Sequence, residues 1–356
     1  MKLFADFERT RQIPMPRAST QFESLNECAD PDFAYARSFV GEWFEHFPDS
    51  AAKSDVHARI TSKDDDQHQT ALFELYIHEL LLRCGFTVVA HPPLKNGVRK
   101  RPDFLASRDN TPTLYVEATT TTESKKHSAE ERVLGAICDA LDKTACRNFI
   151  LSATYSGEQV SMPKLGVLCR KVEEWVSGLD PSQAASGEKP TLTWEEDSWS
   201  IQFRATPISE DLHGAAGLSV VGLASRAARF IVPEEGILQS LREKADSYGA
   251  LHLPFVVAIN MLDRCRREVD IAKGLLRAWG GEDGRRYPNT SAALMAWLPN
   301  AIAAPRVTPI LVHHPHPTYS LLVQDWPLPQ YRLTKAGLIP IANPDAAAPV
   351  LLQLDR

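Results

Sequence analysis

Residues 70–120 constrain the fold of this chain more than any other stretch. Their pattern predicts one helix and three strands, over residues 70–85, 86–94, 100–107 and 113–120. A run of turn-forming residues separates the last two strands, so we expect a β-hairpin centred near Asn110. Because side chains alternate along a strand, the register of this hairpin decides which residues meet on each face.

A hairpin that is symmetric about Asn110 pairs residues equally distant from it in the sequence. Three pairs then share one face: Asp103 with Glu117, Leu105 with Tyr115, and Arg101 with Thr119. The opposite face collects uncharged, mostly apolar residues, which are Pro102, Phe104, Ala106, Leu114, Val116 and Ala118. We expect that second face to pack on the core.

The pairing of Asp103 with Glu117 places two carboxylates directly opposite each other. Like charges in that position destabilise a hairpin, so the pair requires an explanation. A divalent cation such as Mg²⁺ supplies one, because it takes oxygen ligands from one or two carboxylates and keeps several waters. The alternatives are a register shifted by one residue, or a solvated rim where the two charges do not meet.

The helix at residues 70–85 adds a third acid. Its apolar side chains form one arc, and Glu74 lies at the edge of that arc, while Glu79 and Arg83 are expected on the far side. A partly buried Glu74 needs a partner or has a raised pKa. The alternative is a surface glutamate whose carboxylate extends into solvent.

These residues together resemble the PD-(D/E)xK nuclease superfamily, whose core is a helix, a three-stranded meander, a helix and a strand. The resemblance extends to a second helix at residues 128–144 and a fourth strand at 148–156. It implies an α/β fold with a mixed sheet and a restriction-endonuclease-like αβββαβ core. It also implies Mg²⁺ or Mn²⁺ as cofactor, bound by Asp103, Glu117 and the carbonyl of Ala118, with Glu74 as an auxiliary acid.

One position departs from the pattern of that superfamily. The lysine expected two residues after the second acid is Thr119 here. Lys125 and Lys126, just beyond the strand, are the preferred replacements. Arg101 is the other candidate, although arginine stays protonated and serves as an electrostatic stabiliser and not as a base.

Positive charge gathers around the predicted hairpin, at Lys95, Arg99, Lys100 and Arg101. Such a cluster beside the acids suits contacts with the phosphates of a nucleic acid. A solvated loop face is the alternative interpretation. The whole chain has a formal net charge of -6, which argues against a protein that coats nucleic acid without specificity.

Composition narrows the class of protein. The 356 residues suffice for one large or two ordinary domains, and no apolar run approaches the length of a membrane span. The six cysteines are scattered and form no CxxC pair, which indicates a reducing, cytoplasmic compartment without a disulfide framework or a zinc site.

The remaining sequence suggests three regions: a helical N-terminal extension (1–66), the core with a hairpin insertion (67–262), and a proline-rich C-terminal region packed on the core (263–356). In the core, apolar strands are expected at 217–225 and 253–262. The stretch from Lys244 through Tyr248 to Asn260 resembles one that recurs in uncharacterised bacterial proteins with this nuclease-like core, and no function comes with that resemblance.

Two other clusters have structural explanations. Trp194 and Trp199 flank an acidic hairpin turn, where cross-strand packing is a more common role than stacking on a base. Three histidines near the C-terminus, His313, His314 and His316, lie among prolines and alternate between faces, which favours a loop over a metal site.

The expected function is therefore a Mg²⁺-dependent phosphodiesterase that acts on DNA, and the superfamily suggests restriction or defence against foreign DNA. The alternative is a nuclease-fold protein without catalysis that binds nucleic acid or a partner protein as a subunit. The missing lysine favours the alternative, and the three retained acids oppose it. Either function is compatible with a homodimer or a partner subunit.

Overall fold

The computed structural model describes residues 1–13, 15–48, 51–121, 125–144, 148–157, 161–187, 189–196, 198–209, 221–223, 233–262, 268–280 and 285–342, without the side chains of 125–129, 131, 186, 221–223, 233 and 325. The chain forms two compact units. Unit 1 contains Met1–Ile13, Thr20–Glu123 and Ile231–Arg356, and unit 2 contains Pro14–Ser19 and Ser124–Phe230. Within the described parts of the chain, no helix combines the length and apolar character needed to cross a membrane.

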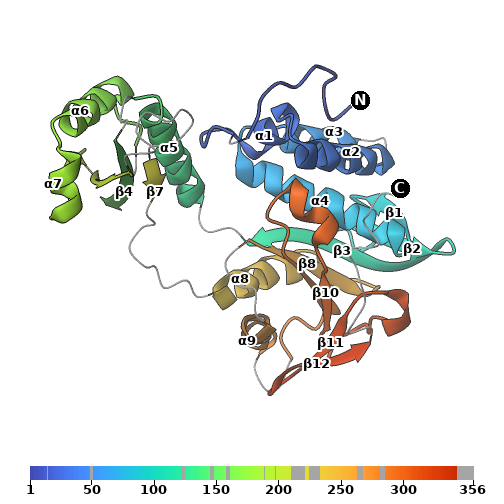
Figure 1. The fold of residues 1–356 in the computed structure, drawn as a ribbon. Coiled ribbons are helices and arrows are strands. Elements are labelled where there is room, and N and C mark those ends of the chain that lie inside the picture. The colour runs from blue at the N-terminus through green and yellow to red at the C-terminus, as the bar shows by residue number, and fades with distance from the viewer. Residues whose placement is uncertain are drawn as a thin grey trace. The chain divides into compact units, whose positions relative to one another are not determined.

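Unit 1 is built on a mixed sheet of eight strands, which confirms the expected α/β class (Figure 1). In spatial order the strands are β1 (Thr87–Ala90), β2 (Phe104–Arg108), β3 (Thr111–Thr121), β8 (Phe255–Met261), β9 (Ala292–Ala296), β10 (Ile310–His313), β11 (Gln330–Thr334) and β12 (Gly337–Ala342). Strand β8 runs parallel to both β3 and β9, and β11 runs parallel to β10, whereas the other neighbours are antiparallel. The C-terminal region thus supplies half of the strands of this sheet.

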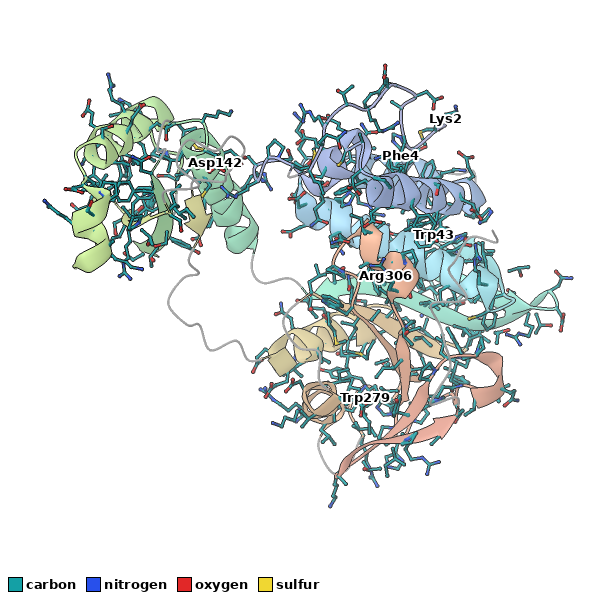
Figure 2. All side chains as sticks on the ribbon, in the orientation of Figure 1. Lys2, Phe4, Trp43, Asp142, Trp279 and Arg306 are labelled. Atoms are coloured by element: carbon teal, nitrogen blue, oxygen red, sulfur yellow. The ribbon has the colours of Figure 1, made fainter. Side chains whose placement is uncertain are left out.

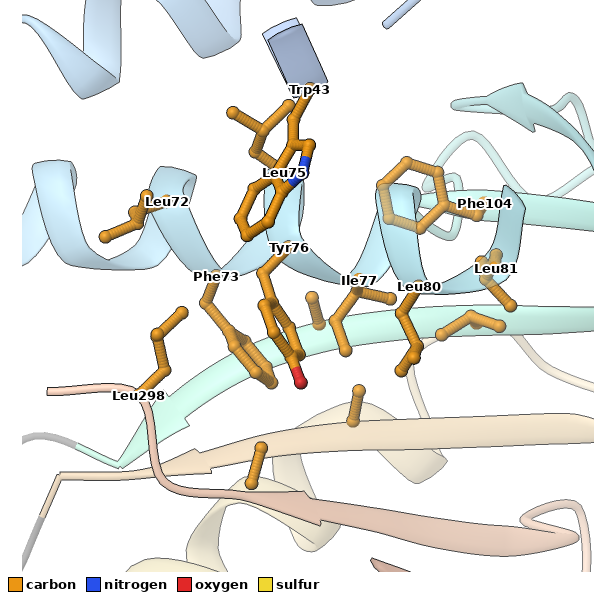
Figure 3. Packing of buried hydrophobic residues seen from close by; sticks show 14 of the residues in the cluster. Trp43, Leu72, Phe73, Leu75, Tyr76, Ile77, Leu80, Leu81, Phe104 and Leu298 are labelled. Atoms are coloured by element: carbon orange, nitrogen blue, oxygen red, sulfur yellow. The ribbon is translucent and has the colours of Figure 1, made fainter. Parts of the chain in front are cut away.

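Helices α1 (Gln21–Glu27), α2 (Pro31–His46), α3 (Ala51–Ile60) and α4 (Asp65–Arg83) lie over one face of this sheet. The side chains of Phe73, Tyr76 and Ile77 point from α4 toward β3, and Trp43 of α2 approaches α4 from the other side (Figure 3). Asp64 caps the N-terminus of α4 by accepting hydrogen bonds from two main-chain N–H groups. Asp65 and Asp66 add negative charge to its first turn, where it stabilises the helix.

Because α4 is covered on two sides, all residues from 71 to 81 are buried. The expectation that Glu79 lies on an exposed side was wrong. Its carboxylate is 2% exposed and accepts hydrogen bonds from Arg83 and His46 at 2.6 and 2.8 Å. The helical period alone did not reveal that the N-terminal helices would cover this side.

The other face of the sheet carries α8 (Pro233–Ala245) and α9 (Glu268–Trp279) and has its own hydrophobic core. Trp43 and Trp279 mark the two cores on opposite sides of the sheet in Figure 2. The short 3-10 helices η3 (Ala301–Arg306) and η4 (Val323–Asp325) connect C-terminal strands. Both faces of β3 are therefore covered. Tyr115 and Glu117 are buried, and so are the residues of the opposite face, Leu114, Val116 and Ala118.

Unit 2 has a smaller sheet with the order β5-β6-β4-β7, formed by β4 (Phe149–Gly157), β5 (Thr191–Glu195), β6 (Trp199–Pro207) and β7 (Val221–Leu223). Its helices are α5 (Lys125–Leu141), α6 (Leu165–Ser177) and α7 (Pro181–Ser186). Trp199 is buried in the core of this unit and Trp194 packs against that core, which agrees with the packing interpretation.

The second helix and fourth strand of the predicted core require a correction. Residues 128–144 and 148–156 do contain α5 and β4, but both elements belong to unit 2. In unit 1, the strand that pairs with β3 on the side away from β2 is β8, and the element before β8 is α8. The order α4-β1-β2-β3-α8-β8 thus results when unit 2 is treated as an insertion, which local sequence patterns could not distinguish from a continuation of the core.

Candidate functional site

The hairpin of β2 and β3 brings the first two acids together. Leu105 pairs with Tyr115, as the predicted register requires, and a shift occurs only beyond Ala106, near the turn. Next to the paired region, the main-chain N–H of Asp103 donates to Glu117 Oε2 at 3.2 Å, and that of Ala118 donates to Asp103 Oδ2 at 2.7 Å. The two carboxylates converge, so neither the shifted register nor the solvated rim describes this pair.

Asp103 has an electrostatically unfavourable environment. Burial raises the pKa of its carboxyl well above the usual value, and the charges of Glu117 and Glu74 raise it further. The Ala118 N–H and the ammonium of Lys244 offset part of this effect. A carboxylate that is held between two other acids and is only 19% exposed is a group that a cation would stabilise.

Glu74 comes from α4 and is the third acid of the cluster. It is 4% exposed, and its Oε2 accepts a hydrogen bond from Arg59 of α3 at 2.6 Å. Its Oε1 is buried and has no hydrogen-bond partner among the described residues. The alternative of a solvent-exposed Glu74 is therefore excluded, and its Oε1 faces the ring of His91.

That oxygen lies 3.7 Å from Nε2 of His91, which in turn lies 4.0 Å from Asp103 Oδ1. His91 follows β1 directly and has a left-handed backbone with φ 47°. The main-chain N–H of His91 donates to the main-chain carbonyl of Asp103 at 2.8 Å. This bond joins the two ends of the loop formed by residues 91–103. The neighbouring Glu74 raises the pKa of His91, although burial alone would lower it.

The ligand atoms that Glu74, His91 and Asp103 offer are suitable for binding a divalent cation. Each offers one ligand atom, and the three atoms lie within 4.8 Å of one another. The buried Oε1 of Glu74 accepts no hydrogen bond from the described residues, so its lone pairs are available to a cation. Of the predicted metal ligands, Asp103 belongs to this set, while the role of the Ala118 carbonyl stays a prediction.

Glu117 has different neighbours, which come from the region of α8. Lys244 Nζ donates to its Oε1 at 2.6 Å, and the Tyr248 hydroxyl donates to its Oε2 at 2.5 Å. Burial alone would lower the pKa of Lys244, but the attraction of Glu117 and Asp103 outweighs it and raises that pKa. Burial, followed by the charge of Glu117, also raises the pKa of Tyr248. Both groups therefore stay protonated and act as donors to the carboxylate.

The lysine beside the acid cluster is thus Lys244. Lys125 and Lys126 begin α5 of unit 2, and their side chains lie outside the described residues. Arg101 does not pair with Thr119, because β2 begins only at Phe104. It lies in the loop, exposed, with its guanidinium 3.4 Å from the carbonyl of His91.

The cations predicted to bind nucleic acid all lie in the loop of residues 91–103 and are exposed. This loop connects two of the candidate metal ligands and contacts the region of α8. Asn96 donates to the carbonyls of Tyr248 and Ala250, and Lys100 Nζ donates to Ser247 Oγ at 2.7 Å. The loop is therefore attached to the segment that supplies the lysine of the site.

Four residues of the site escaped the sequence pattern: Arg59, His91, Lys244 and Tyr248. Lys244 and Tyr248 lie in the stretch that resembles one in bacterial proteins with this core, but nothing in the sequence connects them with Glu117 across more than a hundred residues. His91 and Arg59 gave no signal of their own, since neither belongs to a motif.

The histidines near the C-terminus have partners within the protein. His314 Nε2 contacts the carbonyl of Arg286 at 2.9 Å, while its Nδ1 accepts from the N–H of His316 at 3.0 Å. His313 Nε2 lies 2.8 Å from Gln330 Oε1. These contacts explain the cluster by packing and hydrogen bonding.

No family model, curated protein or solved structure matches the chain. The function is therefore argued from the residues of the site.

Proposed function

We propose that this chain is a metal-dependent phosphodiesterase that cleaves nucleic acid, with Lys244 in the place of the missing motif lysine. The observation that carries the proposal is the contact of the partly buried Lys244 with Glu117 at 2.6 Å, beside two buried acids, Glu74 and Glu117, and the partly buried Asp103. The order α4-β1-β2-β3-α8-β8 supports it, because that order matches the core of the PD-(D/E)xK superfamily.

The donors of Glu74, His91 and Asp103 would hold the divalent cation. Such an ion, when bound, polarises a phosphoryl oxygen and lowers the pKa of a water molecule. Lys244 keeps its proton and has three N–H donors, of which Glu117 uses one. The others are available to stabilise the negative charge that develops on a phosphate in the transition state.

The remaining residues position these groups and the substrate. Arg59 fixes the orientation of the Glu74 carboxylate, and Tyr248 fixes that of Glu117. The exposed cations of the loop at 91–103 would contact phosphates on either side of the reacting one. DNA is the substrate that the superfamily resemblance implies, and restriction or defence against foreign DNA is the setting that it suggests.

The test is cleavage of plasmid DNA and of DNA and RNA oligonucleotides with Mg²⁺ or Mn²⁺. Lys244→Met should lower turnover by a factor of about 100 or more, as for loss of a group that acts mainly in the transition state. Lys273→Met is the matched control, because Lys273 is exposed on α9. Equal rates for wild type and Lys244→Met would reject the role of this lysine.

A second candidate function is supported by one observation. Glu117 already has hydrogen-bond donors on both oxygens, which a structural ion pair would explain without catalysis. In that case the chain binds nucleic acid or a partner protein as a subunit. If wild type cleaves neither DNA nor RNA with either ion but shifts one of them in a gel, this second function replaces the first.

A further inference from the structure

We infer that Glu74, His91 and Asp103 bind a single first-row transition-metal ion, Mn²⁺ in preference to Mg²⁺, and that Glu117 is not one of its ligands. The inference deepens the proposed function and rests on it for the role of the ion. The site itself is argued from contacts of the described residues alone.

The three ligand atoms have the spacing of donors around one ion. Nε2 of His91 lies 3.7 Å from Glu74 Oε1 and 4.0 Å from Asp103 Oδ1. Ligands with bonds of about 2.1 Å lie roughly 3–4.2 Å apart, depending on the angle between them. A small inward movement of the side chains is therefore sufficient to bind the ion.

Glu74 provides independent evidence that one more polar contact is needed in the site. Its Oε1 is buried without a hydrogen bond among the described residues, on a residue that is 4% exposed. A buried acceptor without a partner costs free energy, and a metal ion removes that cost. Arg59 binds the other oxygen and so orients Oε1 toward His91, which is how outer contacts usually fix a metal ligand.

Glu117 is excluded from the ligand set by its own contacts. Lys244 donates to Oε1, and both Tyr248 and the main chain of Asp103 donate to Oε2. An ion that took either oxygen would compete with these donors in a buried site. The sequence-based expectation that Glu117 binds the metal is therefore replaced here by a role as the partner of Lys244.

The imidazole determines the class of the ion. Mg²⁺ prefers oxygen ligands in near-ideal octahedral geometry and keeps several waters, whereas Mn²⁺, the first-row transition metal most suited to carboxylates, accepts an imidazole nitrogen more readily than Mg²⁺ does. The main-chain N–H of His91 donates to the carbonyl of Asp103, and the ring Nε2 lies within 4.0 Å of both carboxylates. Two carboxylates and one imidazole, with room left for water, suit Mn²⁺.

The experiment is calorimetric titration of the metal-free full chain with Mn²⁺ and with Mg²⁺, without nucleic acid. Wild type should bind Mn²⁺ at least about 10-fold more tightly than Mg²⁺. His91→Asn, chosen because asparagine tolerates a left-handed backbone, should weaken Mn²⁺ binding about 10–100-fold and leave Mg²⁺ binding nearly unchanged. The control His316→Ala removes an exposed histidine and should change neither affinity.

Glu117→Gln distinguishes the ligand set Glu74, His91 and Asp103 from a set that includes Glu117. It should change Mn²⁺ affinity by less than about 5-fold, since it removes only a neighbouring charge. A large loss with Glu117→Gln and none with His91→Asn would overturn the inference. Equal affinities of wild type for the two ions, or binding of neither, would also overturn it.

A spectroscopic measurement on wild type covers the case in which a variant does not fold. Electron spin echo spectra of bound Mn²⁺ should show coupling to an imidazole nitrogen, and absence of that coupling would reject His91 as a ligand. The outcomes also separate this inference from the proposed function. Mn²⁺ bound through nitrogen without any cleavage rejects the phosphodiesterase and keeps the site. Cleavage by wild type, together with Mn²⁺ affinity that His91→Asn leaves unchanged, rejects the site and keeps the enzyme.

Discussion

Glu74 and Glu117 are both almost fully buried carboxylates in the same cluster, yet their oxygens have different partners. Glu117 has donors on both oxygens, one of which is an ammonium group. Glu74 has a guanidinium on one oxygen and no hydrogen bond on the other among the described residues. The oxygens of Glu117 all have donors from within the protein, whereas we propose that the Glu74 side binds a metal ion. The predictions below test this difference.

Lys244→Met should have the largest effect on stability. It leaves the buried Glu117 without its cationic partner, so the free energy of unfolding should fall by about 3 kcal/mol or more. Urea denaturation measures the change, with Lys273→Met as the exposed control. Adding Glu117→Gln should recover much of the loss, because the double variant no longer buries an uncompensated charge. A loss of less than about 0.5 kcal/mol in the single variant would show that Glu117 does not depend on Lys244.

Tyr248→Phe should have a smaller effect on the same side of the cluster. It removes the hydroxyl that lies 2.5 Å from Glu117 Oε2, and hydrogen bonds to charged groups contribute about 1.5–3 kcal/mol. Tyr319→Phe is the control, since Tyr319 is 40% exposed. If both variants are as stable as wild type, the phenol does not hold Glu117 in solution.

Asp103→Asn should act in the opposite direction. The pKa of Asp103 is raised, so its ionised form costs free energy in the folded state, and the neutral amide should stabilise metal-free protein by about 1 kcal/mol at pH 8, or roughly 2 °C in Tm. The stabilisation by added Mn²⁺ should disappear. Asp109→Asn, an exposed change in the same hairpin, should alter neither quantity.

The same pKa fixes how this difference depends on pH. A group whose pKa is raised on folding contributes stability below its unfolded value, and this contribution disappears as pH rises through the folded value. Wild type and Asp103→Asn should therefore be similar near pH 4 and diverge at higher pH, measured by thermal unfolding without metal. A constant difference across this range would show that Asp103 is not strained by its neighbours.

His91→Asn should give the smallest effect on the stability of metal-free protein. The pKa of His91 is raised beside Glu74, so the variant should be less stable than wild type near pH 5.5 and approach it as pH rises above the folded pKa of His91. Thermal unfolding at a series of pH values measures this. A loss that grows with pH would mean that the histidine does not pair with Glu74 as an imidazolium.

The hairpin was predictable because its information is local. Asp103 and Glu117 are fourteen residues apart, and the period of two along each strand fixed their common face. Glu74 was recognised from its place on the helical arc. The positions of α8 and of Lys244 could not be predicted, because contacts between residues more than a hundred positions apart leave no local pattern. The prediction for Glu79 was wrong for a similar reason, since the burial of its side chain depends on the packing of α2 on α4.

The insertion of unit 2 also determines when each residue of the site is synthesised. Glu117 leaves the ribosome 127 residues before Lys244, which at about 5–20 residues per second is a delay of roughly 6–25 s. Throughout that interval the nascent hairpin carries its opposed carboxylates without the ammonium that later neutralises them. The acids therefore cannot pack as they do in the finished protein until translation has passed the inserted unit, so the cluster can assume its final form only late in translation.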